Sequence, residues 1–255
     1  MPARLELFAL EGYPLVEPGD DLVHQIADAL AANGLQLEGG DVLVVAQKIV
    51  SKAEGRYRRL ADVQPGPRAL ALAEESGKDP RQVELVLEES REVIRVKPGV
   101  VIVEHRNGYV HANAGIDKSN INNDPDDPLV LLLPLDPDSS ARALREGLFQ
   151  HTGIKPQVII NDSTGRAWRN GTVGIAIGTA GLEPVHNQIG ERDMFGKVLE
   201  VTEPAVADEL AAGASLLMGQ AAQARPVVLA RGANLPPSEV GSGPLIRDRA
   251  MDMFR

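Results

Sequence analysis

Two aspartates, Asp117 and Asp162, each stand where an apolar stretch gives way to a polar one. The ends of strands are where many folds gather side chains from distant segments into one site. Two carboxylates placed in this way could bind one hard cation, and the alternative is that each aspartate only caps a turn. Mg²⁺ or Mn²⁺ fits such a site better than Zn²⁺, because the chain offers carboxylate, hydroxyl and amide oxygens and has no cysteine.

Two lysines follow the short apolar run Asp41–Ala46 (DVLVVA), which is typical of a strand covered on both faces. The run delivers Gln47, Lys48 and Lys52 to its far end. The two lysines are four residues apart, so on a helical turn they would share a face and could both reach phosphate oxygens. The alternative is that both are ordinary exposed lysines.

The segment Asn161–Gly171 (NDSTGRAWRNG) surrounds the second aspartate with arginines and glycines. Glycine permits close backbone approach to a ligand, and arginine presents a fork of donors suited to phosphate or carboxylate. The segment therefore indicates an anion site, with Arg166 and Arg169 as candidates for contact with an anionic ligand. Trp168 could stack on a ring, but we expect it to fill the core.

Several common site patterns are missing from the sequence. There is no GxxxxGK[ST] motif, and Gly174–Gly181 (GIAIGTAG) lacks the strand, turn and helix order of a dinucleotide fingerprint. The five histidines form neither HxH nor HExxH, so we expect each to be a packing or surface residue. The absence of cysteine excludes disulfides and thiolate chemistry. A bound nucleotide would need an architecture other than the Rossmann or P-loop fold.

Composition limits the kind of partner. The chain has 255 residues, 43% of them apolar, which is enough to bury a substantial core. A formal net charge of −10 excludes a broad basic face for nucleic acid, so any anionic ligand must be met by local cations or metal. No apolar run has the length of a membrane-spanning helix, and the first residues lack a signal-peptide pattern. We expect a cytoplasmic protein without nucleic-acid or membrane partners.

The elements that must position these residues follow from hydrophobic periodicity and turn signals. Asn107–Gly108 between two apolar runs is typical of a β-hairpin. The expected strands are Arg4–Leu7, Asp41–Ala46, Val100–His105, Tyr109–Asn113, Leu129–Leu133, Gln157–Ile160, Val173–Gly178 and Pro226–Ala230. The expected helices follow Asp20, cover Arg68–Ser76, begin at Asp79, cover Ser139–His151 and run from Pro204 to Gln220.

Strands and helices that do not alternate strictly predict an α+β fold with mixed or antiparallel sheets and packed helices, rather than a doubly wound parallel sheet. We expect a single domain over residues 1–255, which could be divided into two subdomains. Residues 233–255 are expected to form a C-terminal tail.

Five segments, taken together and in order, resemble one known family. They are EGYPL at Glu11–Leu15, QKIVSKAEGR at Gln47–Arg56, NAGIDKSN at Asn113–Asn120, DSTGRAWR at Asp162–Arg169 and DMFGKVLEVTEPAVADELAAGASLLMGQA from Asp193. By these segments the sequence is identified as a member of the coenzyme F420-0:L-glutamate ligases, and the resemblance spans residues from about 5 to 232.

The resemblance implies an enzyme that uses GTP to join the amine of L-glutamate to the lactyl carboxylate of F420-0, a deazaflavin precursor. Further glutamate would then be added by γ-linkage. The products would be GDP, phosphate and an amide, formed through an acyl phosphate. The resemblance also implies a homodimer whose cleft lies near the subunit contact. Some family members carry a further flavin-binding domain, which we do not expect here.

Carried onto matching positions, the resemblance implies a nucleotide site and two divalent cations, Mg²⁺ or Mn²⁺. Asp117 and Asp162 would hold one cation, and Ser163 and Gln220 the second. Lys48 and Lys52 would stabilise the transferred phosphoryl group. The residues implied to contact the nucleotide are Gly12, Tyr13, Pro14, Leu15, Gln47, Lys48, Lys52, Asn120, Ser215, Leu216, Leu217, Met218, Gly219, Gln220, Ala221 and Ala222.

The sequence departs from the family pattern at two places. Asn161 stands where a serine-like residue is expected before the second aspartate, and His186–Gly190 (HNQIG) lacks an expected acidic residue. Two alternatives therefore stay open. One is a paralogous amide ligase that acts on another carboxylate, and the other is a protein that binds nucleotide or deazaflavin without turnover.

Overall fold

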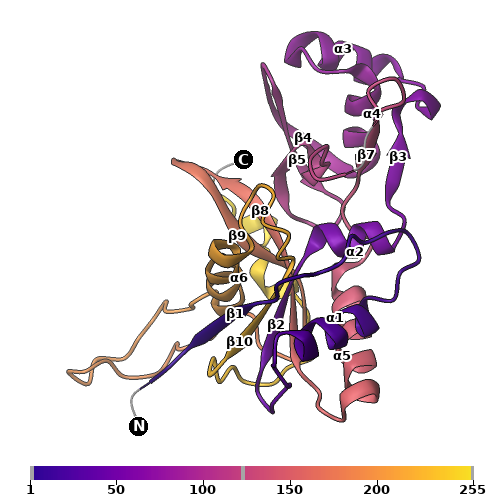
Figure 1. Ribbon diagram of the computed structural model, residues 1–255. Coiled ribbons are helices and arrows are strands. Elements are labelled where there is room, and N and C mark those ends of the chain that lie inside the picture. Colours follow the sequence, from indigo (N-terminus) through magenta and orange to yellow (C-terminus); the bar gives the residue numbers. More distant parts are fainter. Residues whose placement is uncertain (1–2, 122–123, 254–255) are drawn as a thin grey trace.

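The computed structural model describes residues 3–121 and 124–253. The ends of the predicted domain, residues 1–2 and 254–255, and residues 122–123 lie outside this description. The chain forms two lobes (Figure 1). The small lobe comprises residues 57–131, and the large lobe comprises the rest of the described chain.

The large lobe is built on a five-stranded sheet in the order β1-β10-β2-β8-β9. Strands β2 and β8 pair in parallel, and every other neighbouring pair in this sheet is antiparallel. Its strands are β1 (Glu6–Ala9), β2 (Val42–Ala46), β8 (Gln157–Arg166), β9 (Arg169–Ala180) and β10 (Val227–Arg231).

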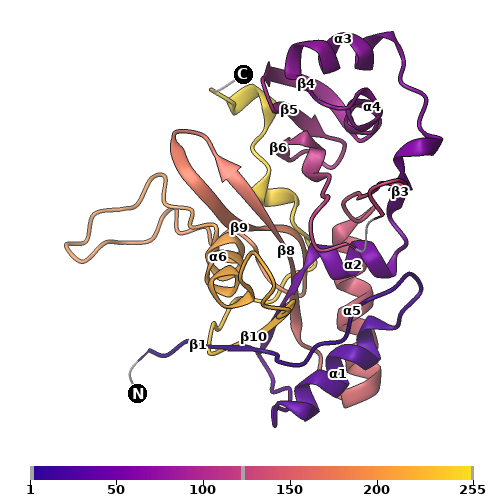
Figure 2. The ribbon, with the colours of Figure 1, turned by 45° about the horizontal axis from the view of Figure 1, so that its top comes forward.

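Helices cover both faces of this sheet (Figures 1 and 2). On one face lie α1 (Leu22–Ala32) and α5 (Pro137–Thr152), and on the other lies α6 (Val206–Met218). Strand β2 alternates between the two cores, because Leu43 packs with α1 and α5 whereas Val44 packs with α6. Two buried faces explain why this strand has a continuous apolar sequence.

The small lobe packs two helices against two small sheets. Strands β4, β5 and β6 form one antiparallel sheet, and β3 pairs with β7 in the other. Their shared core includes Leu60, Leu85, Val103 and Leu132. The elements are β3 (Tyr57–Arg59), α3 (Pro67–Ser76), α4 (Pro80–Glu88), β4 (Ser90–Lys97), β5 (Val100–His105), β6 (Val110–Ala112) and β7 (Leu129–Leu131).

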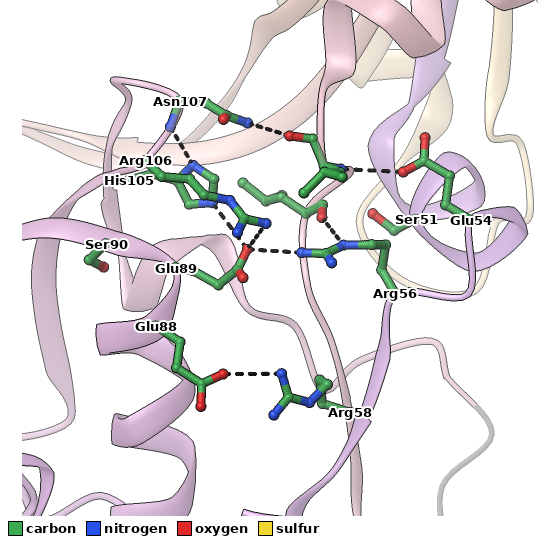
Figure 3. A network of polar contacts seen from close by, with 12 residues as sticks. Ser51, Glu54, Arg56, Arg58, Glu88, Glu89, Ser90, His105, Arg106 and Asn107 are labelled. Atoms are coloured by element: carbon green, nitrogen blue, oxygen red, sulfur yellow. Dashed lines mark hydrogen bonds and ion pairs between the residues drawn. The ribbon is translucent and has the colours of Figure 1, made fainter. Parts of the chain in front are cut away.

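A buried ionic cluster joins the lobes (Figure 3). The Glu89 carboxylate, at the end of α4, lies 2.9 Å from Arg56 Nη2 and 2.8 Å from Arg106 Nη2. Arg56 also donates to the carbonyl oxygen of Leu133, which is in the large-lobe core. Burial opposes the charge of Glu89, but the neighbouring His105, whose Nε2 lies 3.7 Å from Oε2, and the two guanidinium charges hold the pKa of Glu89 below the usual range. The cluster thus connects the end of α4, the β5–β6 turn and the segment that precedes β3.

The expected α+β class is confirmed, and most expected elements appear within a few residues of their predicted bounds. The expected strands Gln157–Ile160 and Val173–Gly178 are both longer than predicted and extend into the segment between them. Strands β8 and β9 pair as far as Arg166 and Arg169. Asp162 therefore lies within β8, and the segment forms a β-hairpin. Trp168 occupies its two-residue turn with a φ of 64° and 87% of its surface exposed, so it does not fill the core.

Residues after β10 run back along the molecule. Ser242 is buried and its amide donates to Asp138 in α5, while Leu245 packs on the α6 core. Arg249 then reaches Glu92 of the small lobe at 2.5 Å. This C-terminal segment therefore touches both lobes. Within the described ranges, no helix is long and apolar enough to cross a membrane.

Candidate functional site

A cleft of about 890 Å³ opens where the two lobes meet. Segments of the large lobe supply most of its wall, and the small lobe contributes Tyr57, Leu129 and the segment 117–121 that follows β6. The predicted site residues that line the cleft are Tyr13, Pro14, Leu15, Gln47, Lys48, Lys52, Asp117, Asn120, Asp162, Ser163, Met218, Gly219, Gln220, Ala221 and Ala222. Segments far apart in the sequence therefore converge on one cavity.

The lysines reach the cleft because β2 passes directly into α2 (Gln47–Ala53). Lys48 and Lys52, one helical turn apart, both line the cavity. Burial lowers the pKa of Lys52, and the charge of Lys48 lowers it further. Two lysine ammonium groups placed this close together favour the binding of an anionic ligand, because its negative charge would stabilise the charged form of both side chains.

Asp117 meets Lys48 across the cleft. Lys48 Nζ lies 2.5 Å from Asp117 Oδ2 and also donates to the carbonyl oxygen of Ser119 at 2.9 Å. The amide and hydroxyl of Ser119 donate to Asp117 Oδ1 at 2.7 and 2.8 Å. Burial alone would raise the pKa of Asp117, but the bonds from Lys48 and Ser119 hold it below the usual range. This carboxylate is therefore ionised at neutral pH.

Asp162 has the opposite electrostatic character. Its side chain is only 12% exposed, and burial together with the charge of Asp117 raises its pKa to about 7. The amide of Ser163 donates to Oδ1 at 2.8 Å, and the side chain of Gln47 also hydrogen-bonds this carboxylate. Two carboxylates whose charges repel one another in one cleft would both be stabilised by a cation between them.

The residue set fits a hard divalent cation. Asp117 and Asp162 supply carboxylates, Ser163 a hydroxyl and Gln220 an amide, and all four line the cleft. Within the described ranges, no three histidine, aspartate or glutamate side chains gather closely enough to hold a metal by themselves. A cation here would take its remaining ligands from hydroxyl, amide, water or substrate oxygens, as Mg²⁺ commonly does.

The end of α6 forms the opposite wall of the cleft. Asn120 donates from Nδ2 to the carbonyl oxygen of Ala221 at 3.1 Å, which ties the loop after Asp117 to this wall. Asn161 donates to Ser215 Oγ at 3.0 Å. The asparagine that departs from the family pattern thus fastens β8 to α6.

Some predicted site residues do not line the cavity. Gly12, Ser215, Leu216 and Leu217 lie near it in sequence but are not in its wall. Arg166 and Arg169 sit at the exposed end of the β8–β9 hairpin, and the structure does not bring them to the cleft of the same chain.

Sequence reasoning missed Ser119, Tyr57 and Arg225, which all line the cleft. Ser119 lies two residues after Asp117, in the position of an Asx turn, and this was the available signal. Arg225 precedes β10 and pairs with Glu11 at 2.7 Å, while its Nε is buried without a hydrogen-bond partner in the described part of the chain. Nothing local marks that arginine as a site residue.

Comparison with known proteins identifies the family of this chain. The profile of the F420-0:Gamma-glutamyl ligase family matches residues 12–232. A coenzyme F420:L-glutamate ligase of Methanothermobacter thermautotrophicus is 48% identical, over 98% of this chain and 99% of its own. Ligases of the same name from Methanopyrus kandleri and Archaeoglobus fulgidus are 43% and 45% identical, over 98% and 91% of this chain and 99% and 89% of theirs. The chain belongs to the F420-0:gamma-glutamyl ligase family.

Proposed function

We propose that this protein is a GTP-dependent ligase that joins L-glutamate to F420-0 by an amide bond and then adds γ-linked glutamate. The observation that carries the proposal is the single cleft in which Lys48 and Lys52 face Asp117 and Asp162. A site that contains both positively charged lysines and carboxylates able to bind a metal ion suits the transfer of a phosphoryl group. Family membership supplies the acceptor and the amino acid.

The nucleotide would lie along the wall formed by Tyr13–Leu15, α2, Asn120 and residues 218–222. Its phosphates would meet the ammonium groups of Lys48 and Lys52. Asp117 and Asp162 would hold one Mg²⁺ or Mn²⁺, and Ser163 and Gln220 a second. A divalent cation bound there would neutralise phosphate oxygens and polarise the γ-phosphorus.

The reaction needs activation of a carboxylate, because a free carboxylate is a poor acceptor for an amine. One oxygen of the F420-0 carboxylate attacks the γ-phosphorus of GTP, and the bond to the bridging oxygen of GDP breaks. The amine of glutamate then attacks the acyl carbon, phosphate leaves with that carboxylate oxygen, and the amine loses a proton. Lys48 and Lys52 stabilise the transferred group by charge and position, with no covalent enzyme intermediate.

Oxygen-18 in the lactyl carboxylate of F420-0 tests this route. The proposal requires one labelled oxygen in the released phosphate for each amide formed. Unlabelled phosphate alongside amide would exclude an acyl phosphate. Amide formed only with a different carboxylate would identify a paralogous ligase, and GTP binding without phosphate release would identify a binding protein.

Exposed apolar side chains support a homodimer. Met194 and Phe195 are 95% and 93% exposed and lie on the loop between β9 and α6, which extends away from the sheet in Figure 2. Val201 on the same loop and Trp168 on the hairpin tip are also exposed. Large exposed apolar groups of this kind are typical of interaction surfaces. Light scattering should give the mass of two chains, and Phe195→Ser should shift it toward one.

A further inference from the structure

His111 lies directly behind Asp162. It sits on β6, where it pairs with Val103 of β5, and its side chain is only 3% exposed. Its Nδ1 is 3.7 Å from Asp162 Oδ2. The ring is therefore buried beside the carboxylate and outside the cleft wall, because Asp162 lines the cleft and His111 does not.

The surroundings of His111 fix the orientation of its ring. The ring of Tyr109 packs edge-on against it with centroids 5.4 Å apart, and the Tyr109 hydroxyl itself donates to the carbonyl oxygen of Ile177. His111 Nε2 is buried and has no hydrogen-bond partner in the described part of the chain. The ring is therefore enclosed, with Nδ1 as the nitrogen nearest to the Asp162 carboxylate.

A ring N–H is more favourable on the nitrogen that faces an acceptor than on one that is buried without a partner. Nδ1 faces a carboxylate oxygen, whereas Nε2 faces no acceptor in the described chain. The other oxygen of Asp162 is already fixed by the amide of Ser163. A hydrogen bond from His111 Nδ1 to Oδ2 of Asp162 would hold the second oxygen as well, and the orientation of the carboxylate group would then be fixed.

We propose that His111 is a positioning residue, whose Nδ1–H donates to the Asp162 carboxylate and orients it toward a divalent cation in the cleft. This inference rests on the proposed cation-binding role of Asp162. The hydrogen bond requires the present 3.7 Å separation to shorten to about 3 Å when the cation binds. Residues behind a metal ligand commonly act in this way, and their loss typically weakens metal binding by about 10- to 100-fold.

Three substitutions separate positioning from packing. His111→Phe keeps an aromatic ring and removes the donor. His111→Asn places an amide nitrogen at about the position of Nδ1, whereas His111→Gln places it at about that of Nε2. His24→Phe serves as a control, because His24 is 64% exposed and pairs with Asp21 in α1, away from the cleft.

The measurement is Mn²⁺ binding to the purified protein, followed by the electron paramagnetic resonance signal of the free ion. We expect the Phe and Gln variants to bind about 10-fold more weakly or worse, and the Asn variant to stay within about 3-fold of the unsubstituted protein. The Phe variant should also need more Mn²⁺ for half-maximal phosphate release while keeping its rate at saturating Mn²⁺. Thermal melting in EDTA confirms that each variant is folded.

Equal Mn²⁺ affinity in the Phe variant and the unsubstituted protein would overturn the inference, and so would equal losses in the Asn and Gln variants. Asp162→Asn in the same assay separates this from the proposed function. If Asp162→Asn abolishes Mn²⁺ binding and His111→Phe leaves the Mn²⁺ affinity unchanged, only the role of His111 is wrong. If Asp162→Asn binds Mn²⁺ normally, the cation site itself is wrong.

Discussion

Lys48 and Asp117 form an ion pair across the cleft, with Nζ 2.5 Å from Oδ2, and so join α2 of the large lobe to the segment that follows β6. The ammonium lies beside a carboxylate proposed to hold a divalent cation. Lys48 and a divalent cation would therefore compete for the carboxylate of Asp117. If a nucleotide phosphate and the cation bound together, Lys48 would exchange its contact with Asp117 for a contact with the phosphate. This exchange links the two halves of the proposed site.

Replacement of Lys48 should separate catalysis from cation binding. In Lys48→Met we expect phosphate release to fall about 100-fold or more, because one of the two lysine charges that stabilise the transferred phosphoryl group is lost. Mn²⁺ affinity should stay the same or rise, because Asp117 loses its competing partner. Lys155→Met is a matched control, since Lys155 pairs with Glu146 at the surface. Normal phosphate release by Lys48→Met would remove Lys48 from the mechanism.

Asp162 should make the metal-free protein sensitive to pH. Its pKa rises from an ordinary 3.8 to about 7 on folding, so the folded state disfavours the ionised form. The stability that the protonated carboxyl provides is complete below about pH 4 and is lost as pH rises through 7. At about 1.4 kcal/mol for each pKa unit, the full loss is about 4–5 kcal/mol.

Urea unfolding in EDTA at pH 5 and pH 8 measures this effect. Asp162→Asn cannot ionise, so its free energy of unfolding should fall less between these pH values than that of the unsubstituted protein. Divalent cation should restore stability to the unsubstituted protein at pH 8 and not to the variant. Identical pH dependence of the two proteins would show that Asp162 is not held in an unfavourable ionised state.

The Glu89 cluster should matter far more to stability than its neighbour in Figure 3. Glu89→Gln leaves Arg56 and Arg106 partly buried without a counter-charge, which should cost about 3–5 kcal/mol. Glu88→Gln is the matched control, because its pair with Arg58 is exposed and should be worth less than about 1 kcal/mol. Chemical denaturation compares the two, and equal losses would contradict the account.

Arg225 lies in the wall of the cleft, whereas Arg166 and Arg169 do not. Arg225 lines the cleft with a buried Nε that lacks a partner in the described chain, so Arg225→Ala should weaken GTP binding about 10-fold. Arg166 and Arg169 lie on the hairpin away from that wall, so alanine at either should leave GTP affinity within about 2-fold. Isothermal titration calorimetry measures all three. Weaker GTP binding by the hairpin variants would mean that the site extends beyond the cleft.

Local patterns were enough to predict much of the frame. The apolar run in β2, the aspartate cap of α4 and the turn at Asn107–Gly108 each carry a short-range physical signal. The shared face of Lys48 and Lys52 followed from helical spacing in the same way. These features depend on neighbours within about one turn, so the sequence contains them directly.

The remaining features depend on contacts that no local pattern encodes. The glycines and charges of Asn161–Gly171 are typical of a loop, yet pairing with β9 makes them a hairpin and exposes Trp168. The lone histidine His111 carries no motif, and only the packing of β6 against β8 brings it to Asp162. Arg225 reaches the cleft because β10 lies beside β2.

Mass spectrometry of the products tests the central claim most directly. The protein is incubated with F420-0, L-glutamate, GTP and Mg²⁺ or Mn²⁺, with matched reactions that omit one component each and one that contains Asp117→Asn. We predict that F420-0 gains one or more glutamyl units only when all four components and the unsubstituted protein are present. An unchanged F420-0 mass in the complete reaction, with GTP bound to a folded protein, would contradict the proposed ligase activity.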